Sequence, residues 1–133
     1  MIAWITVALA SYQTEVPTDT TVVRGVIAHV QVEEDARGLR STYEVHVEEC
    51  LRGAAPDWLQ VTLPGGEHEG RRMEVAGLPL WKVGDDAIVS VDPEGRAPLN
   101  GQFVVHGEAL SPSLPGWPQR LAHLEELLAA STL

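Results

Sequence analysis

The sequence predicts a mainly β fold: a small, partly closed antiparallel β-barrel with OB-like character, five to six strands and a C-terminal α-helix. Three observations lead to this prediction. Between Ser41 and Gly53, apolar and polar residues alternate with a period of two, which is typical of a strand with one buried face. Further short apolar runs follow, separated by turn sequences such as Pro64-Gly65-Gly66. From Trp117 onward, leucines recur instead at spacings of three and four, as they do on one face of a helix.

The first two predicted strands form a hairpin. The first runs from Thr21 to Glu33, and Gly25 within it indicates a bend or bulge. A charged loop follows and leads into the Ser41–Gly53 segment, which we expect to be the central strand of the sheet. With the loop centred on residues 35–38, Gln31 is predicted to face Thr42. In the same register His29 faces Glu44, and Ile27 faces His46. The valines of both strands are expected to point into the core.

The second strand also requires an irregularity near its end. The Glu48-Glu49 pair interrupts the alternation, so Cys50 or Leu51 returns to the core most easily through a bulge. Cys50 is therefore expected to be a small buried side chain. It is the only cysteine, which excludes an intrachain disulfide and a cysteine-based zinc site within one chain.

The remaining elements follow in order. Leu78 to Gly84 is apolar but contains a proline, so it is predicted to be a connector packed on the barrel. Ala87 to Val91 is apolar almost throughout, which indicates a strand buried on both faces or inside a closed sheet. The other predicted elements are a third strand at Trp58 to Leu63, a polar loop at Glu67 to Arg71, a short strand containing Met73 and Val75, a strand at Gln102 to His106, a loop at Ser111 to Gly116 and a helix at about 118–130.

The length of 133 residues predicts a single domain, spanning residues 21–133, after a short signal or N-terminal arm in residues 1–20. Met1 to Ala10 is apolar, and Ala8 and Ala10 match the small residues of a signal-peptide cleavage site. The alternatives are a first β-strand or a loosely attached N-terminus. The segment is shorter than the roughly 20 residues that span a bilayer, so membrane insertion is not expected. A secreted or periplasmic location is favoured over a cytoplasmic one.

The charge balance limits the partners. Nineteen Asp and Glu residues against nine Lys and Arg residues give a formal net charge of -10. Such a charge repels phosphate backbones and anionic lipid surfaces. Nucleic acid and membrane partners are therefore disfavoured.

Several turn and strand-edge residues also give the chain a resemblance to a known group of proteins. They include Gly25-Val26-Ile27, Leu51-Arg52-Gly53, Pro64-Gly65-Gly66, Val83-Gly84-Asp85 and Gly101-Gln102-Phe103. Over about residues 22–107 the chain resembles an uncharacterised small β-barrel domain, OB-like in appearance, that occurs in exported bacterial proteins. The resemblance implies a fold and an export route, but it carries no catalytic residues.

Candidate catalytic and metal sites are few. His68-Glu69 lacks the second histidine of the H-E-x-x-H zinc motif, and there is no G-x-S-x-G, phosphate-binding loop or dinucleotide motif. His29, Glu44 and His46 are predicted to share the polar face of the first hairpin, where two imidazoles and a carboxylate would suit a divalent metal. The alternative for these three residues is an ordinary solvated face.

The acidic residues and tryptophans of the strand ends have structural explanations as well. Asp85, Asp86, Asp92 and Glu94 lack the spacing of a calcium loop and are predicted to be turn and strand-edge residues. Trp58 and Trp81 either line a ligand groove or cover the core. The mixed-charge segment Glu67 to Arg72 is either a partner contact or a solvated loop tip.

These observations favour a non-enzymatic binding or accessory domain, without a cofactor, that contacts protein or polysaccharide. A metal-assisted hydrolase that uses His29, Glu44 and His46 is the first alternative. A nucleic-acid-binding OB domain is the second, although the basic groove with exposed aromatics that it requires is missing from the sequence.

Overall fold

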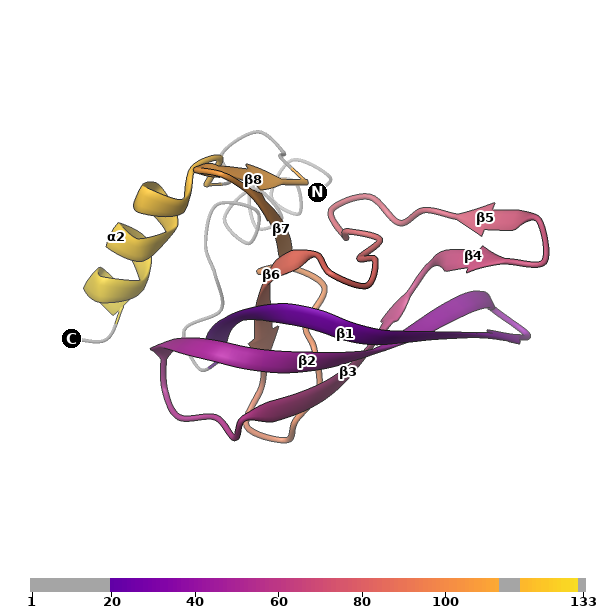
Figure 1. Cartoon of the computed structure of the whole chain (residues 1–133), viewed down its shortest axis with the longest axis horizontal. Helices are drawn as coiled ribbons and strands as arrows, with labels where there is room; N and C mark the ends of the chain where they lie inside the picture. Colours follow the sequence, from indigo (N-terminus) through magenta and orange to yellow (C-terminus); the bar gives the residue numbers. More distant parts are fainter. Residues whose placement is uncertain (1–19, 113–117, 132–133) are drawn as a thin grey trace, which may run out of the picture.

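The computed structural model describes residues 20–112 and 118–131 and shows an open antiparallel sheet with one helix (Figure 1). The main sheet has the strand order β3-β2-β1-β6-β7-β8, and β4 and β5 form a separate two-stranded sheet. The elements are β1 (Thr21–Asp35), β2 (Gly38–Arg52), β3 (Trp58–Pro64), β4 (Gly66–His68), β5 (Arg71–Met73), β6 (Asp86–Val91), β7 (Phe103–His106), β8 (Ala109–Ser111) and α2 (Leu121–Ser131). The predicted mainly β antiparallel fold with a C-terminal helix is confirmed.

β1 and β2 form the predicted hairpin, with Gln31 opposite Thr42. The pairing shifts at three points, because Ala28 is an extra residue in β1 and Glu48 and Leu51 are extra residues in β2. Such bulges bend a strand and increase its local twist. The predicted irregularity after Val47 is therefore confirmed.

Gly25 lies beside one of these shifts and is required by close packing. A Cβ atom at Gly25 would lie 2.3 Å from the backbone carbonyl oxygen of His46, closer than van der Waals contact allows. Glycine therefore permits the two strands to approach at the bend. The irregularity predicted at Gly25 is confirmed by the shift in pairing between Arg24 and Gly25.

Two hydrophobic clusters lie on opposite faces of the sheet, and β1 and β6 contribute to both. Val23 and Val89 belong to the first cluster, whereas their neighbours Val22 and Ile88 belong to the second. All four side chains are fully buried. The prediction that the Ala87–Val91 segment is buried on both faces is confirmed.

The connector between β5 and β6 covers the first cluster, as predicted. Trp81 is 3 % exposed, and its indole Nε1 donates a hydrogen bond of 3.0 Å to the carbonyl oxygen of Phe103. Its ring also packs against the edge of Tyr43, with 5.0 Å between the ring centroids. Trp81 therefore serves the core, while the other tryptophan in question, Trp58, is 55 % exposed.

Helix α2 covers the second cluster through its leucines. Leu124 and Leu128 are buried there, and Leu121 packs against them at the start of the helix. The predicted leucine stripe is confirmed, but the helix begins at Leu121 and not near residue 118. The residues that it buries close the second face of the sheet where β1, β6 and β7 meet.

The sheet does not close into the predicted barrel, because its two edge strands β3 and β8 do not pair. The outer side of β8 is covered by the chain that leads into α2: the Leu110 N–H donates to the Gln119 carbonyl and the Leu121 N–H to the Glu108 carbonyl, both at 2.8 Å. β2 is second from the edge, so the prediction of a central Ser41–Gly53 strand is wrong. The strands buried between both clusters, β1 and β6, take the central places.

Several local predictions also need correction. Cys50 is exposed and not buried, because Leu51 is the extra residue of the bulge and turns toward the second cluster in its place. The short strand β8 was not predicted, and its last residue, Ser111, is the first residue of the predicted Ser111–Gly116 loop. The predicted Glu67–Arg71 loop is largely the hairpin of β4 and β5. Val75 was predicted to share a strand with Met73, but β5 ends at Met73. The predicted signal at Met1 to Ala10 lies outside the described residues.

The β4–β5 hairpin packs on the far end of the β1–β2 hairpin (Figure 1). A Cβ atom on Gly66 would lie 2.5 Å from the Ser41 hydroxyl oxygen, so this contact is close. Arg71 also forms an ion pair with Glu34, and its guanidinium lowers the pKa of that carboxyl group. The two hairpins therefore end side by side at one end of the molecule.

A methyl group at Gly25 tests the close approach of β1 and β2. Gly25→Ala is expected to lower the free energy of unfolding by about 3 kcal/mol, because the clash is with backbone and cannot be relieved by a rotamer change. Urea denaturation measures the change. Gly70→Ala is the control, since its Cβ meets open space and only the positive φ, on the order of 1 kcal/mol, opposes it. Equal losses in the two variants would contradict the close approach.

The buried phenol of Tyr43 predicts a loss of stability in alkali. Burial raises the pKa of Tyr43 above its ordinary value of about 10. The folded protein then holds this proton more tightly than the unfolded chain, so stability falls as pH rises from about 10 through the folded-state pKa. Urea titrations between about pH 8 and pH 11 should show a steeper fall for the parent than for Tyr43→Phe. Parallel curves would contradict the assignment.

Candidate functional site

The three residues of the predicted metal site are only partly brought together. His29 lies opposite Glu44, as predicted, but the bulge at Ala28 places His46 opposite Val26 instead of Ile27. The His46 ring stacks on Trp58, with 4.8 Å between the centroids and 34° between the planes. Among the described residues there is no group of three His, Cys, Asp or Glu side chains that could hold a metal ion.

The other acidic candidates are engaged in local structure. The Asp92 carboxylate accepts backbone hydrogen bonds from Glu94 and Arg96, at 3.0 and 2.8 Å, and the Asp85 carboxylate accepts one from Lys82 at 2.8 Å. Asp86 binds Arg24 through both carboxylate oxygens, at 3.0 and 2.7 Å. Their predicted role as turn and strand-edge residues is confirmed.

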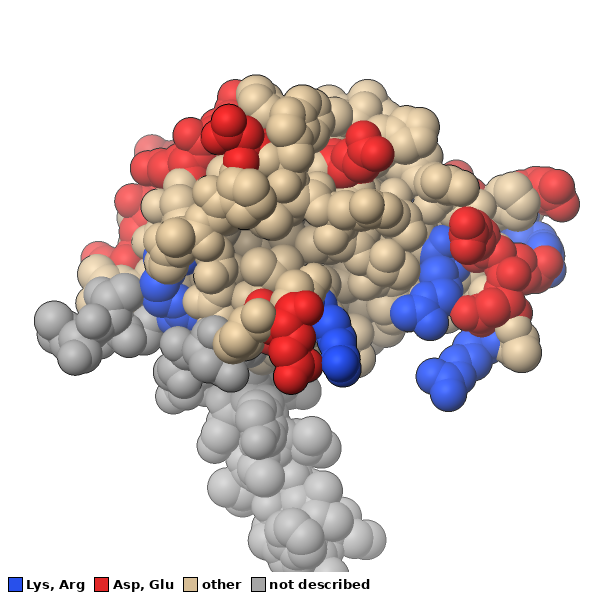
Figure 2. All heavy atoms as spheres, turned by 90° about the horizontal axis from the view of Figure 1, so that it is seen from below, with Lys and Arg blue, Asp and Glu red and all other residues tan. Residues whose placement is uncertain are grey.

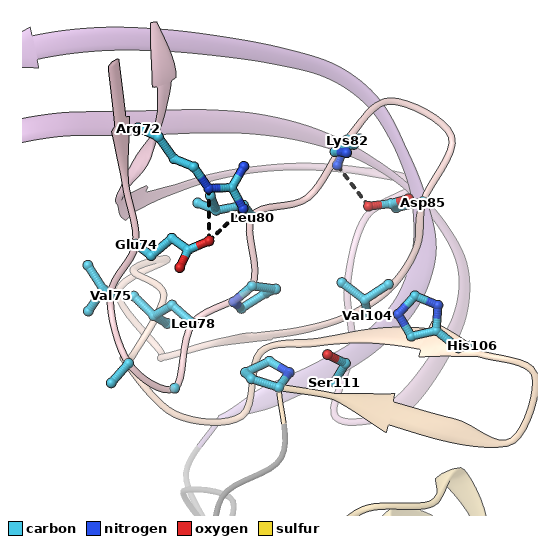
Figure 3. Close-up of a pocket in the computed structure, with 14 residues that line it drawn as sticks. Arg72, Glu74, Val75, Leu78, Leu80, Lys82, Asp85, Val104, His106 and Ser111 are labelled. Atoms are coloured by element: carbon cyan, nitrogen blue, oxygen red, sulfur yellow. Dashed lines mark hydrogen bonds and ion pairs between the residues drawn. The ribbon is translucent and has the colours of Figure 1, made fainter. Parts of the chain in front are cut away.

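An open groove of about 700 Å³ lies between the connector before β6 and the β7–β8 hairpin (Figure 3). Apolar side chains from both sides line it, including Leu78, Leu80 and Val104. At one end Arg72 donates to Glu74 at 2.8 and 2.5 Å, so this cation is already neutralised.

The groove contains a serine and a histidine, which raises the question of a nucleophile. Ser111 and His106 both line it, on neighbouring strands. No hydrogen bond joins the Ser111 hydroxyl to the His106 imidazole in the structure. An activated serine requires a base within hydrogen-bonding distance. The groove therefore offers a concave surface with no assembled nucleophile and base among residues 20–112 and 118–131.

The second candidate surface is the outer edge of β3. Two backbone bonds fix its orientation: Val47 N–H donates to the Asp57 carbonyl and Gly65 N–H to the Leu39 carbonyl, both at 2.8 Å. In an antiparallel ladder, successive residues direct their N–H and C=O groups alternately toward the partner strand and away from it. The odd-numbered residues from Asp57 to Gly65 therefore bond to β2.

The even-numbered residues consequently direct their backbone groups away from the sheet. These are Trp58, Gln60 and Thr62, bounded by Pro56 and Pro64, which have no N–H. No hydrogen bond reaches the outer side of β3 from any part of the chain that the structure describes. Three N–H donors and their carbonyls, between two prolines, therefore form an edge that no described residue covers; it is called the free edge below.

The side chains of β3 do not protect this edge. Proteins usually guard an exposed strand edge with charged residues, prolines, bulges or a covering segment. β3 has no charged residue between Trp58 and Pro64, although the whole chain carries a net charge of -10. By contrast, the part of β1 that extends beyond β6 ends in Glu33, Glu34 and Asp35. The free edge of β3 thus differs from the acidic end of β1 in having no charged side chain.

The polar face beside the edge contains the predicted residues. Thr62 bonds Thr42 through their hydroxyl groups at 3.0 Å, Gln60 lies opposite Glu44, and Trp58 stacks on His46. Glu44 and His46 therefore lie next to the free edge, and they do not belong to a group of described residues that could hold a metal ion. The edge itself was not predicted from the sequence. A strand between Pro56 and Pro64 without a lysine or arginine was the signal that could have indicated an unprotected edge.

Comparison with protein-family models, curated proteins and solved structures finds no match to this chain. The described residues include no helix long and apolar enough to cross a bilayer. The function must therefore be inferred from the surfaces described above.

The orientation of β3 predicts an alternating pattern of hydrogen exchange. The amides of Trp58, Gln60 and Thr62 should exchange much faster than those of Leu59, Val61 and Leu63, which bond to β2. Residue-resolved exchange by NMR measures this pattern. Uniform protection along β3 would mean that another segment covers the edge and would contradict the assignment.

Proposed function

We propose that this protein is a non-enzymatic binding domain that accepts an extended polypeptide segment of a partner protein on the outer edge of β3. The observation that supports it is the row of backbone groups at Trp58, Gln60 and Thr62, on an uncharged strand, that have no hydrogen-bond partner in the part of the chain that the structure describes. An added strand would pair with these groups and extend the sheet, which is an established mode of peptide recognition.

The surroundings of the edge suit such a partner. Trp58 is 55 % exposed beside the edge, and an exposed indole offers a large apolar area with a polar N–H. Stacking on His46 restrains the ring, so less side-chain entropy is lost on binding. The two prolines limit the new ladder to the interval between them. They also restrict the edge-to-edge association of many copies that longer free edges allow.

A polysaccharide partner is the second candidate, and it is favoured by the same tryptophan. Trp58 lies on a face with the amide of Gln60 and the hydroxyls of Thr42 and Thr62, and together these groups offer stacking and hydrogen bonding to a sugar chain. A sugar contacts these side chains and not the backbone N–H groups. The two candidates therefore differ in which substitution removes binding.

The deciding experiment compares two substitutions at one position. Gln60→Ala removes the side chain and keeps the backbone N–H, whereas Gln60→Pro removes both. Proline is tolerated where a strand N–H points away from the sheet, so both variants are expected to fold. Random displayed peptides of about 12 residues, long enough to cover β3, serve as the probe.

Peptides selected on the parent should bind Gln60→Pro at least about tenfold more weakly and Gln60→Ala within about threefold of the parent. Equal binding to the parent and Gln60→Pro, or no selection above background, would contradict strand addition. A parent that sediments as a dimer and becomes monomeric in Gln60→Pro would contradict the peptide partner and assign the edge to a second copy. A soluble polysaccharide that binds the parent and Gln60→Pro but not Trp58→Ala would favour the second candidate instead.

A further inference from the structure

The far end of the two hairpins contains a small pocket where β3 ends. Its volume is about 230 Å³, and its apolar lining comes from Leu39, Pro64, Met73 and Leu99. This is smaller than the roughly 300 to 1,000 Å³ of pockets for small molecules. The space therefore suits one aliphatic side chain. Leu99 is 60 % exposed at the pocket, which leaves apolar area for a partner to cover.

The charges around this pocket are unevenly matched. Figure 2 shows basic and acidic side chains intermixed at this end of the molecule, while uncharged atoms fill the middle of the same view. Arg71 pairs with Glu34, and Arg72 pairs with Glu67 and Glu74. These two arginines are therefore already neutralised.

The arginines that line the pocket differ from these two. Arg40 lies 3.7 Å from the carboxylate of Asp35, and both side chains are nearly half exposed. Arg37 uses its backbone N–H, at 2.8 Å, to bond Asp35, but its guanidinium has no carboxylate partner in the described parts of the chain. Arg37 thus presents a positive charge, without a carboxylate partner among residues 20–112 and 118–131, at a pocket that Asp35 and Arg40 also line.

We infer that this tip pocket determines the sequence preference of the segment that adds to β3: it takes an aliphatic side chain from the end of the segment, and Arg37 pairs with a carboxylate beside that side chain. The inference rests on the proposed strand addition. A segment that extends along the free edge past Thr62 reaches Pro64, which lines the pocket. The backbone contacts accept any sequence, so side-chain contacts at the end of the ladder must supply the specificity.

The length of the ladder strengthens this assignment. Among the described residues of β3, only Trp58, Gln60 and Thr62 have N–H groups without a partner, so the added ladder is short. Its backbone hydrogen bonds do not distinguish one partner sequence from another. A guanidinium recognises a carboxylate through two parallel N–H groups. A neutral edge followed by an aliphatic pocket and an unpaired arginine therefore selects a neutral extended segment with an aliphatic and an acidic residue at one end.

The test uses the displayed peptide library on three full-length proteins: the parent, Arg37→Glu and Arg96→Glu. Arg96→Glu changes the net charge by the same amount as Arg37→Glu and therefore controls for net charge. Arg96 lies in the turn after β6, where it pairs with Glu94. On the parent and on Arg96→Glu, selected peptides should be enriched in Asp or Glu next to Leu, Ile, Val or Met. On Arg37→Glu, that position should change to Lys or Arg.

Affinities of individual synthetic peptides then measure the contacts. Replacing the acidic residue by its amide should weaken binding to the parent about three- to fivefold, as for a partly exposed ion pair, and should not weaken binding to Arg37→Glu. The difference should shrink as the salt concentration rises toward 1 M, where the Debye length is about 3 Å. Leu99→Ala should reduce the preference for the aliphatic residue and leave the acidic preference in place.

The outcomes separate this inference from the proposed function. Peptides that depend on the Gln60 N–H but show no acidic preference, or the same preference on Arg37→Glu, would overturn the role of the pocket and leave strand addition standing. Selection of no peptide on the parent would overturn both.

Discussion

Burial of β1 and β6 on both faces is the constraint on which the rest of this structure depends. Val22 and Val23 point to opposite clusters, as do Ile88 and Val89, and none of the four is exposed to solvent. A sheet with both faces covered in its middle needs a layer on each side. The Trp81 connector supplies one layer and α2 the other. Because α2 and the chain before it also cover β8, the covering is asymmetric, and no segment among the described residues covers the outer edge of β3 at the opposite side.

Much of the hairpin could be predicted from the sequence, because its register follows from alternation and loop position. The pairing of Gln31 with Thr42 and the irregularity at Gly25 are examples. Predictions failed at the bulges, where one extra residue changes the face of the sheet to which the following side chains point. Alternation cannot show that Glu48 and Leu51 are both extra residues, so it placed Cys50 in the core. Nor can it show that Ala28 is an extra residue in β1, so the predicted partner of His46 was one position away from Val26, its actual partner. Strand order is set by packing between distant segments, and a pattern in one strand does not specify which strand lies at the edge. The Ser41–Gly53 strand was placed at the centre of the sheet for this reason.

The candidate surfaces follow from the same asymmetry. A free edge is costly for a protein to keep, since it can pair with any extended chain. On this molecule the acidic residues are placed elsewhere, including the end of β1, while β3 contains none. The groove near Ser111 shows the opposite arrangement, with charges that are already matched at Arg72 and no bonded nucleophile. The proposed surface contact gives a role to the exposed Trp58, whereas Trp81 is buried in the core.

Strand addition to β3 is tested most directly by hydrogen-bond scalar couplings in a complex of the isotope-labelled protein with a selected, carbonyl-labelled peptide. The proposal predicts new couplings from the amides of Trp58, Gln60 or Thr62 to peptide carbonyls, because these N–H groups point away from β2. The amides of Leu59 and Val61 should keep their couplings to β2. A bound peptide that produces no coupling to β3, and instead shifts the resonances of groove residues such as Leu78 and Val104, would contradict strand addition and move the binding site to the groove.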